Sequence, residues 1–153
     1  METVGMRYFN VFGPRQNPKG AYAAVIPKFI EQLQRDEPPT INGDGSYSRD
    51  FTFIANVVEA NISLLTLPSI TPKVWGEIFN VGAGGRITIF EMYEAIRRAM
   101  GKEIKPILGP LRPGDIPHSN ASIEKASSAF GYNPTVDFAE GIKQTLEHYC
   151  KLS

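Results

Sequence analysis

Three arginines of this 153-residue chain lie next to glycine or proline, and they are the first candidates for binding chemistry. Arg15 follows Gly13-Pro14, Arg49 follows a glycine-rich turn, and Arg112 precedes Pro113-Gly114-Asp115. The planar fork of a guanidinium group matches the oxygens of a phosphate. The alternative is that these arginines form structural ion pairs at the surface, for example Arg112 with Asp115. Spacing alone therefore indicates no more than a domain with an anion-binding site.

Other kinds of site find less support in the sequence. There is no P-loop, and the two histidines, His118 and His148, are too widely separated to indicate a metal site. The turn Gly82–Arg86 precedes a helix and can hold an anion, but its Gly-x-Gly-Gly spacing is not a dinucleotide fingerprint. We interpret it as a simple turn. No spacing pairs the candidate acids and bases, which are Asp44, Asp50, Glu59 and Glu91.

Composition excludes several classes of partner. The 16 Lys and Arg residues balance 16 Asp and Glu residues, so bulk charge gives no reason to expect nucleic acid or an anionic membrane as a partner. No apolar run approaches the roughly 18 residues of a membrane span. The single cysteine, Cys150, cannot form an internal disulfide, which fits a reducing cytoplasm.

The pattern of apolar residues predicts an α/β fold. The run Val4–Phe12 is nearly all apolar or aromatic, which is typical of a strand buried on both faces of a parallel sheet. Such a strand needs neighbours, and no segment of the sequence precedes it. The rest alternates between short strands and helices, so we expect a small mixed domain attached to one or two strands of a larger sheet.

Five helices are predicted from apolar residues at helical spacing. The first begins near Val25, because Pro27 is tolerated only in a first turn. Three others begin at a capping residue followed three positions later by glutamate, and the predicted pairs are Asn56 with Glu59, Thr88 with Glu91, and Asp137 with Glu140.

Four ordered motifs resemble the extended short-chain dehydrogenase/reductases, which include the NAD-dependent nucleotide-sugar epimerases and dehydratases. The motifs are Arg7–Gln16, Gly43–Phe51, Phe79–Gly82 and Arg112–Asp115. The resemblance covers nearly the whole chain, but only about the C-terminal half of such an enzyme. It implies that residues 1–16 belong to an NAD-binding Rossmann-like sheet whose main part is absent, with their partner strands upstream of Met1. Residues 17–153 would form the nucleotide-sugar-binding domain.

The resemblance also implies roles for individual residues. Asn10 would donate a hydrogen bond to the substrate diphosphate, and Arg49 and Arg112 would pair with its phosphates. Asp115 would accept hydrogen bonds from the ribose hydroxyls. The base pocket would be lined by Thr40, Asn42, Ile89 and the backbone of Val25.

Within this family, the chain is most similar to 4-epimerases that accept N-acetylated hexoses. A small residue follows the Arg-x-Gly-Asp motif in that group, where glucose-only relatives often carry tyrosine; here the residue is Ser119. Gln16 and Ala24 also match residues that border the sugar. Room for an acetamido group implies UDP-N-acetylglucosamine and UDP-N-acetylgalactosamine as substrates.

The family's catalytic motifs are not in this sequence. In the family, the glycine-rich NAD loop, a serine or threonine residue and the Tyr-x-x-x-Lys motif all lie upstream of the opening strand. This chain has no Tyr-x-x-x-Lys. We therefore expect NAD to bind the full-length parent enzyme and not this chain alone, which should contain no catalytic residue and be inactive.

Three alternatives remain open for such a chain. One is a free-standing nucleotide-sugar-binding module, another is a module that completes a separate NAD-binding domain in trans, and the third is part of a related dehydratase or decarboxylase. Because Met1 resembles an internal position of the family, we expect the opening strand to be exposed, displaced or paired with another copy.

Overall fold

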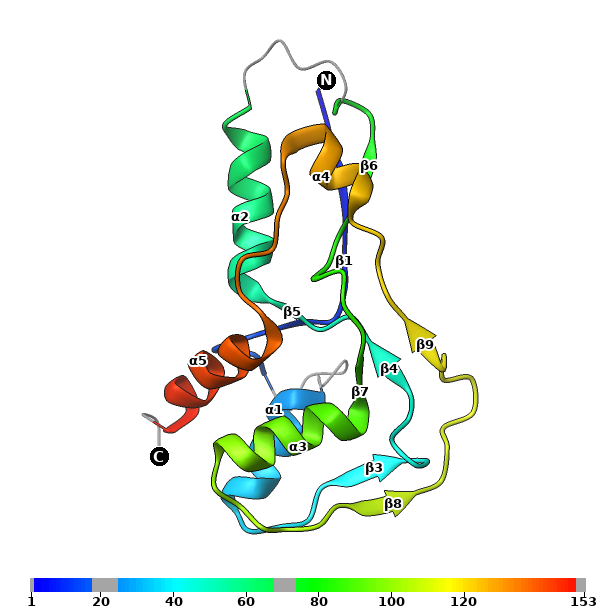
Figure 1. Cartoon of the computed structure of the whole chain (residues 1–153), viewed down its shortest axis with the longest axis vertical. Helices are drawn as coiled ribbons and strands as arrows, with labels where there is room; N and C mark the ends of the chain where they lie inside the picture. The colour runs from blue at the N-terminus through cyan, green and yellow to red at the C-terminus, as the bar shows by residue number, and fades with distance from the viewer. Residues whose placement is uncertain (1, 18–24, 68–73, 151–153) are drawn as a thin grey trace.

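Short strand pairs connect five helices in the computed structural model, which describes residues 2–17, 25–67 and 74–150 (Figure 1). The chain folds as the expected mixed α/β structure with small sheets. The helices are α1 (Val25–Gln34), α2 (Ile54–Leu65), α3 (Ile89–Ala99), α4 (Glu124–Phe130) and α5 (Phe138–Cys150). The strands are β1 (Gly5–Tyr8), β2 (Val11–Phe12), β3 (Thr40–Asn42), β4 (Ser48–Arg49), β5 (Thr52–Phe53), β6 (Ile78–Val81), β7 (Ile87–Thr88), β8 (Ile107–Gly109) and β9 (His118–Ser119).

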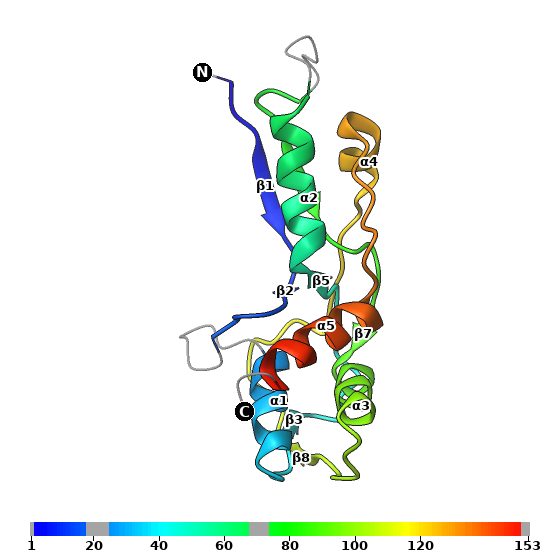
Figure 2. The same cartoon turned by 90° about the vertical axis from the view of Figure 1, so that its left-hand side faces the viewer.

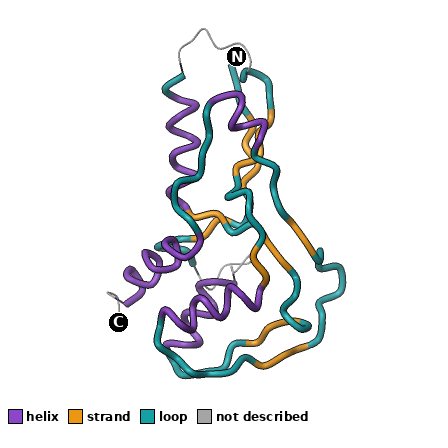
Figure 3. The backbone as a smooth tube through the Cα atoms, in the orientation of Figure 1, coloured by secondary structure: helices purple, strands orange, loops and turns teal. Residues whose placement is uncertain are grey.

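Most of the strand pairs are parallel and join segments distant in the sequence. β1 pairs with β6, β2 with β5, and β3 with β8, all in parallel. β4 lies between β7, which is antiparallel to it, and β9, which is parallel. Among the described residues no sheet exceeds three strands, and Figure 3 shows these short strands strung between the helices.

The opening run is not the continuous, doubly buried strand that its composition predicts. It divides into β1 and β2 around Asn10, whose φ of 32° is left-handed. One edge of β1 pairs with β6, with Met6 opposite Phe79, while Tyr8 remains about half exposed. The expectation that all partner strands lie upstream of Met1 is therefore wrong, because β6 supplies one neighbour from within the chain.

Two apolar cores hold the molecule together. One gathers α1, α3 and α5 around β2, β3 and β5, with Phe12, Phe29 and Tyr93 among its fully buried side chains. The other joins α2, β6 and α4, and Val4 and Met6 from the opening strand region pack against it. Figure 2 shows β1, α2 and α4 together at the end of the molecule away from α1 and α3.

One predicted capping box is confirmed and another is wrong. The Thr88 side chain accepts from the Glu91 amide at 3.1 Å, and Glu91 accepts from the Thr88 amide at 2.8 Å, so α3 begins as predicted. At α2, Phe53 is the N-cap and no side chain caps the helix. Asn56 is buried instead, and it bonds the backbone of Thr135 and Val136 at 2.7–3.1 Å. Long-range partners have outcompeted the local cap.

No helix in the described parts of the chain combines the length and the apolar character that crossing a bilayer requires.

Candidate functional site

A cavity of about 350 Å³ opens where α1, β3, β4 and the start of α3 meet the loop after β8. The residues that line it come from five separate stretches of the chain. Eight of the eleven residues selected from the sequence are among them, namely Asn10, Val25, Thr40, Asn42, Arg49, Ile89, Arg112 and Asp115.

The other three selected residues lie elsewhere. Gln16 follows β2, where its Nε2 donates to the Val11 carbonyl at 2.9 Å, and it does not line this cavity. Ser119 lies in β9 directly opposite Arg49, so it neighbours the cavity wall without being part of the lining. Ala24 falls outside the described residues.

Five lining residues were not selected from the sequence, and these are Lys28, Phe29, Ile41, Tyr47 and Phe51. Phe29 belongs to the apolar stripe of α1, and a stripe residue is ordinarily assigned to the core. Lys28 was detectable in principle, because it follows Val25 by one helical turn and therefore shares its side of α1.

Asn10 reaches the cavity from the break between β1 and β2. Its left-handed φ of 32° is one that asparagine adopts more readily than most residues. The Thr52 amide donates to the Asn10 carbonyl at 3.3 Å, which ties this break to β5. The side chain is exposed, so its amide is accessible to a ligand in the cavity.

Three hydrogen-bond acceptors fix the Arg49 side chain in the wall of the cavity. Its Nη2 donates to Asp115 Oδ1 at 2.7 Å, and its Nη1 donates to the carbonyl oxygens of Ser48 at 2.9 Å and Pro117 at 3.3 Å. The ion pair suggested by spacing, Arg112 with Asp115, does not form. Among the described residues the exposed Arg112 side chain has no hydrogen bond or ion pair, so its guanidinium is available for a ligand.

The capping box of α3 sets the position of Ile89. The Ile89 amide donates to the Tyr47 carbonyl at 2.8 Å, next to the hydrogen-bonded pair of Thr88 and Glu91. Hydrogen bonds from the backbone and hydroxyl of Thr88 lower the pKa of the Glu91 carboxyl. Gly45 lets its turn pack closely against the start of α3, since a Cβ at Gly45 would lie 2.9 Å from the Phe90 Cβ.

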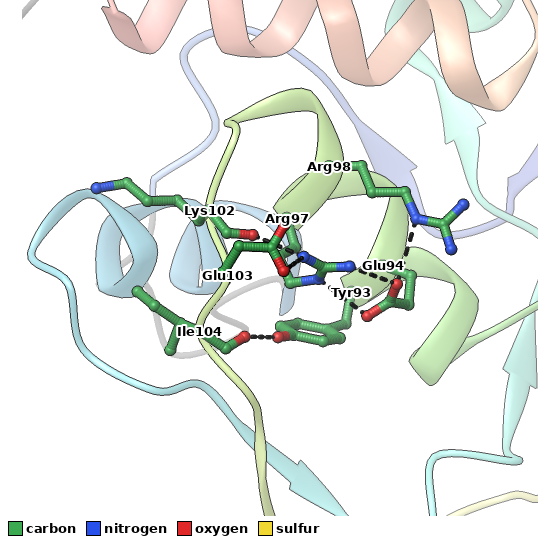
Figure 4. Close-up of polar contacts among 7 residues, drawn as sticks. All are labelled: Tyr93, Glu94, Arg97, Arg98, Lys102, Glu103 and Ile104. Atoms are coloured by element: carbon green, nitrogen blue, oxygen red, sulfur yellow. Dashed lines mark hydrogen bonds and ion pairs between the residues drawn. The ribbon is translucent and has the colours of Figure 1, made fainter.

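A partly exposed network of ion pairs and hydrogen bonds fixes the segment between α3 and β8 (Figure 4). Arg97 bonds Glu94 at 3.0 Å, Glu103 at 3.0 Å and the Lys102 carbonyl at 2.8 Å. The side-chain hydrogen bond from Arg97 is the main cause of the lowered pKa of Glu94. The Tyr93 hydroxyl donates to the Ile104 carbonyl, shortly before β8 pairs with β3. Thr40 and Asn42 therefore belong to a strand pair, β3 with β8, whose position these contacts hold.

The glycine turn after β6 already holds an anion from the chain itself. Asp50 is fully buried, and its carboxylate accepts from the amides of Ala83 at 2.8 Å, Gly84 at 3.0 Å and Ala121 at 3.3 Å. At Gly82 a Cβ would lie 2.6 Å from Asp50 Oδ2. The turn is thus a structural clamp for β4 and is not open to a phosphate.

In the described regions no group of three or more His, Cys, Asp or Glu side chains converges in a way that could hold a metal ion. His118 is exposed, and its Nδ1 is 2.9 Å from the hydroxyl of the buried Ser48. It therefore helps to pair β9 with β4.

Comparison with known proteins identifies the family. Residues 1–82, more than half of the chain, match the model of the NAD dependent epimerase/dehydratase family. The chain belongs to this family. Its motifs and its α/β architecture agree with that membership, as the resemblance implied.

Individual relatives include more than one activity. A "Putative UDP-glucose 4-epimerase" from Methanocaldococcus jannaschii is 35% identical over 95% of this chain and 45% of its own length. A "UDP-N-acetyl-alpha-D-glucosaminuronate decarboxylase" from Bacillus cytotoxicus is 30% identical over 94% of this chain and 45% of its own. A solved UDP-N-acetylglucosamine 4-epimerase from Methanobrevibacter ruminantium, in complex with UDP-N-acetylmuramic acid, is 36% identical with a TM-score of 0.90. It aligns with 100% of this chain and 47% of its own. The chain thus spans about half the length of these relatives.

Proposed function

We propose that this chain forms the nucleotide-sugar-binding part of an NAD-dependent UDP-sugar 4-epimerase. The observation that carries the proposal is the single cavity lined by Asn10, Arg49, Arg112 and Asp115. Amide and guanidinium donors suit phosphate oxygens, and a carboxylate suits ribose hydroxyls. The epimerase relatives support the proposal independently of this chemistry.

Under this proposal the residues that line the cavity have different roles. Asn10 and Arg112 bind the diphosphate, and Arg49 contributes positive charge while holding Asp115. Thr40, Asn42, Val25 and Ile89 line the space for the base. An apolar and amide wall of this kind matches a planar ring with a polar edge.

The residues described here do not fit NAD. The one glycine-rich turn that precedes a helix is filled by the Asp50 carboxylate, and the sequence has no Tyr-x-x-x-Lys. The proposal therefore assigns this chain substrate binding only, and it assigns NAD and the proton-transfer groups to the whole enzyme. When bound, NAD supplies the hydride acceptor and donor for the change of configuration.

For the sugar, we propose N-acetylated hexoses, with UDP-N-acetylglucosamine as one epimer. The support is the small Ser119, which lies opposite Arg49 in the β4–β9 pair and is only half-buried. Ser119→Tyr should weaken UDP-N-acetylglucosamine binding and spare UDP, whereas Ser119→Ala should leave both affinities unchanged. If Ser119→Tyr bound UDP-N-acetylglucosamine as tightly as the wild type does, this substrate assignment would be contradicted.

A second reaction in the same family is favoured by one finding. The decarboxylase relative from Bacillus cytotoxicus matches this chain over the same region as the epimerases do. A decarboxylase acts on a sugar carboxylate, so calorimetry with a UDP-uronic acid tests whether the site takes a uronate. Tighter binding of the uronate than of UDP-N-acetylglucosamine would contradict the N-acetylhexose assignment. Release of carbon dioxide by the whole enzyme, measured against formation of the 4-epimer, would then separate decarboxylation from epimerisation.

Two measurements test the main proposal. Titration calorimetry of the 153-residue chain should detect binding of UDP, and inosine diphosphate should bind more weakly if the base pocket has the proposed specificity. A chain that does not bind UDP would overturn the proposal. The chain supplied with NAD should not interconvert UDP-N-acetylglucosamine and its galacto epimer, and turnover would refute the expected inactivity.

A further inference from the structure

Lys28 is a cation in the wall of the cavity that the family motifs leave without a role. It lies in the first turn of α1, three residues after Val25, and its side chain is exposed. In the described parts of the chain it makes no hydrogen bond or ion pair, whereas Lys102 and Lys125 pair with Asp36 and Glu77.

The charges around the cavity give Lys28 its significance. Three cationic side chains, Lys28, Arg49 and Arg112, and one carboxylate, Asp115, line the cavity, so its net charge is +2. The Arg49 guanidinium already donates to Asp115 and to two carbonyl oxygens. Lys28 and Arg112 are therefore the two lining cations without an internal partner among the described residues. A nucleotide-sugar diphosphate carries about two negative charges, one on each phosphate.

We propose that Lys28 is a second charged ligand of the substrate diphosphate, acting together with Arg112. This inference rests on the proposed function and assigns one more residue to the same site. Lysine is a mobile point charge with three donors, so it can follow a phosphate that has no fixed geometry. Position in the first turn of α1 adds the positive end of the helix dipole to the same charge. A neutral uracil ring offers no comparable attraction to an ammonium group.

The variants are chosen to separate charge from packing. Lys28→Met keeps most of the stem and removes the charge, and Lys28→Arg retains the charge. Lys105→Met is the matched control, because Lys105 is exposed and lines a different cavity beside Glu103. All of these positions are exposed, so thermal unfolding should show that each variant folds like the wild type.

The experiment compares UDP, UMP and uridine by calorimetry at low and at moderate salt. We expect Lys28→Met to weaken UDP binding by about three- to tenfold and to leave uridine unchanged. The loss should shrink as salt rises, because the affected interaction is between charges. Lys28→Arg should restore most of the affinity, and Lys105→Met should match the wild type.

Each result decides the proposal. If Lys28→Met binds UDP like the wild type while the wild type still prefers UDP to uridine, the Lys28 assignment is wrong and the proposed function stands. An equal loss for uridine and UDP would place Lys28 at the base and would also overturn it. A wild-type chain that binds no UDP would remove the proposed function and this inference together.

Discussion

Arg49 and Asp115 form an ion pair at 2.7 Å although 66 residues separate them in the sequence. The pair joins β4 to the loop that carries Arg112, and the bonds from Arg49 to Ser48 and Pro117 reinforce it. Arg49 thus acts as a brace for the binding loop in the free chain. Asp115 is held by a cation before any ligand arrives.

Replacement of Arg49 should make the loop that carries Arg112 and Asp115 more mobile. Arg49→Lys keeps the charge but cannot reach three acceptors with a planar fork. We expect faster amide hydrogen exchange in residues 110–117, measured by mass spectrometry, with little change in α3. Arg112→Lys is the control, because Arg112 has no side-chain partner in the described structure. Equal exchange in both variants would show that Arg49 does not order the loop.

Removal of Arg112 should act on binding and not on folding. Arg112→Ala should weaken UDP affinity by more than tenfold, since a charged hydrogen bond contributes about 1.5–3 kcal/mol. The exposed side chain has no internal partner among the described residues, so the melting temperature should stay within about 2 °C. Calorimetry tests this. Arg98→Ala, which lies outside the cavity, is the control, and unchanged UDP affinity in Arg112→Ala would contradict the site assignment.

Neutralising Asp50 should destabilise the fold. In Asp50→Asn an amide nitrogen replaces one of two oxygens that accept from the Ala83, Gly84 and Ala121 amides. A buried donor facing donors costs about 2–3 kcal/mol of unfolding free energy, measured by urea denaturation. Asp36→Asn is the control, because Asp36 is exposed and its ion pair with Lys102 lies at the surface. A cost below about 0.5 kcal/mol for Asp50→Asn would show that the clamp is dispensable.

Tyr132 should make stability depend on alkaline pH. Its hydroxyl donates to the Gly82 carbonyl at 2.9 Å, and burial, followed by the nearby Asp50 carboxylate, raises the pKa of Tyr132 to about 12. A free tyrosine has a pKa of about 10. Because the folded-state pKa is raised, the stabilisation is complete below about pH 10 and is lost as the pH rises through about 12.

Two measurements on Tyr132→Phe check this dependence. The difference in 295 nm absorbance between wild type and variant should titrate near pH 12, and the loss of stability between pH 10 and 12 should be smaller in the variant. Tyr8→Phe should keep the late titration step, because Tyr8 is half exposed and its hydroxyl bonds Asn61 and not the Gly82 carbonyl. A difference titration centred near pH 10 would show that Tyr132 is not shielded.

The sequence by itself determined the local elements and the identity of most cavity residues. Thr88 and Glu91 lie three residues apart, and their reciprocal hydrogen bonds begin α3 where this spacing predicts it. Four short motifs were enough to select Asn10, Arg49, Arg112 and Asp115, because their chemistry and order are distinctive. Pro27, which is tolerated only in a first turn, likewise located the start of α1 near Val25. These features depend on neighbours within a few residues or on residue type.

Tertiary structure decided how these residues are paired. Nothing in the spacing indicates that Asp115 binds Arg49 and leaves Arg112 free. Nor does it indicate that the Asn56 side chain accepts from the Thr135 backbone instead of capping α2. The Gly82 turn could hold a ligand by sequence, yet the fold fills it with Asp50. The physical reason is that a hydrogen-bonding group takes the partner that the folded chain brings within about 3 Å, and sequence separation does not limit that choice.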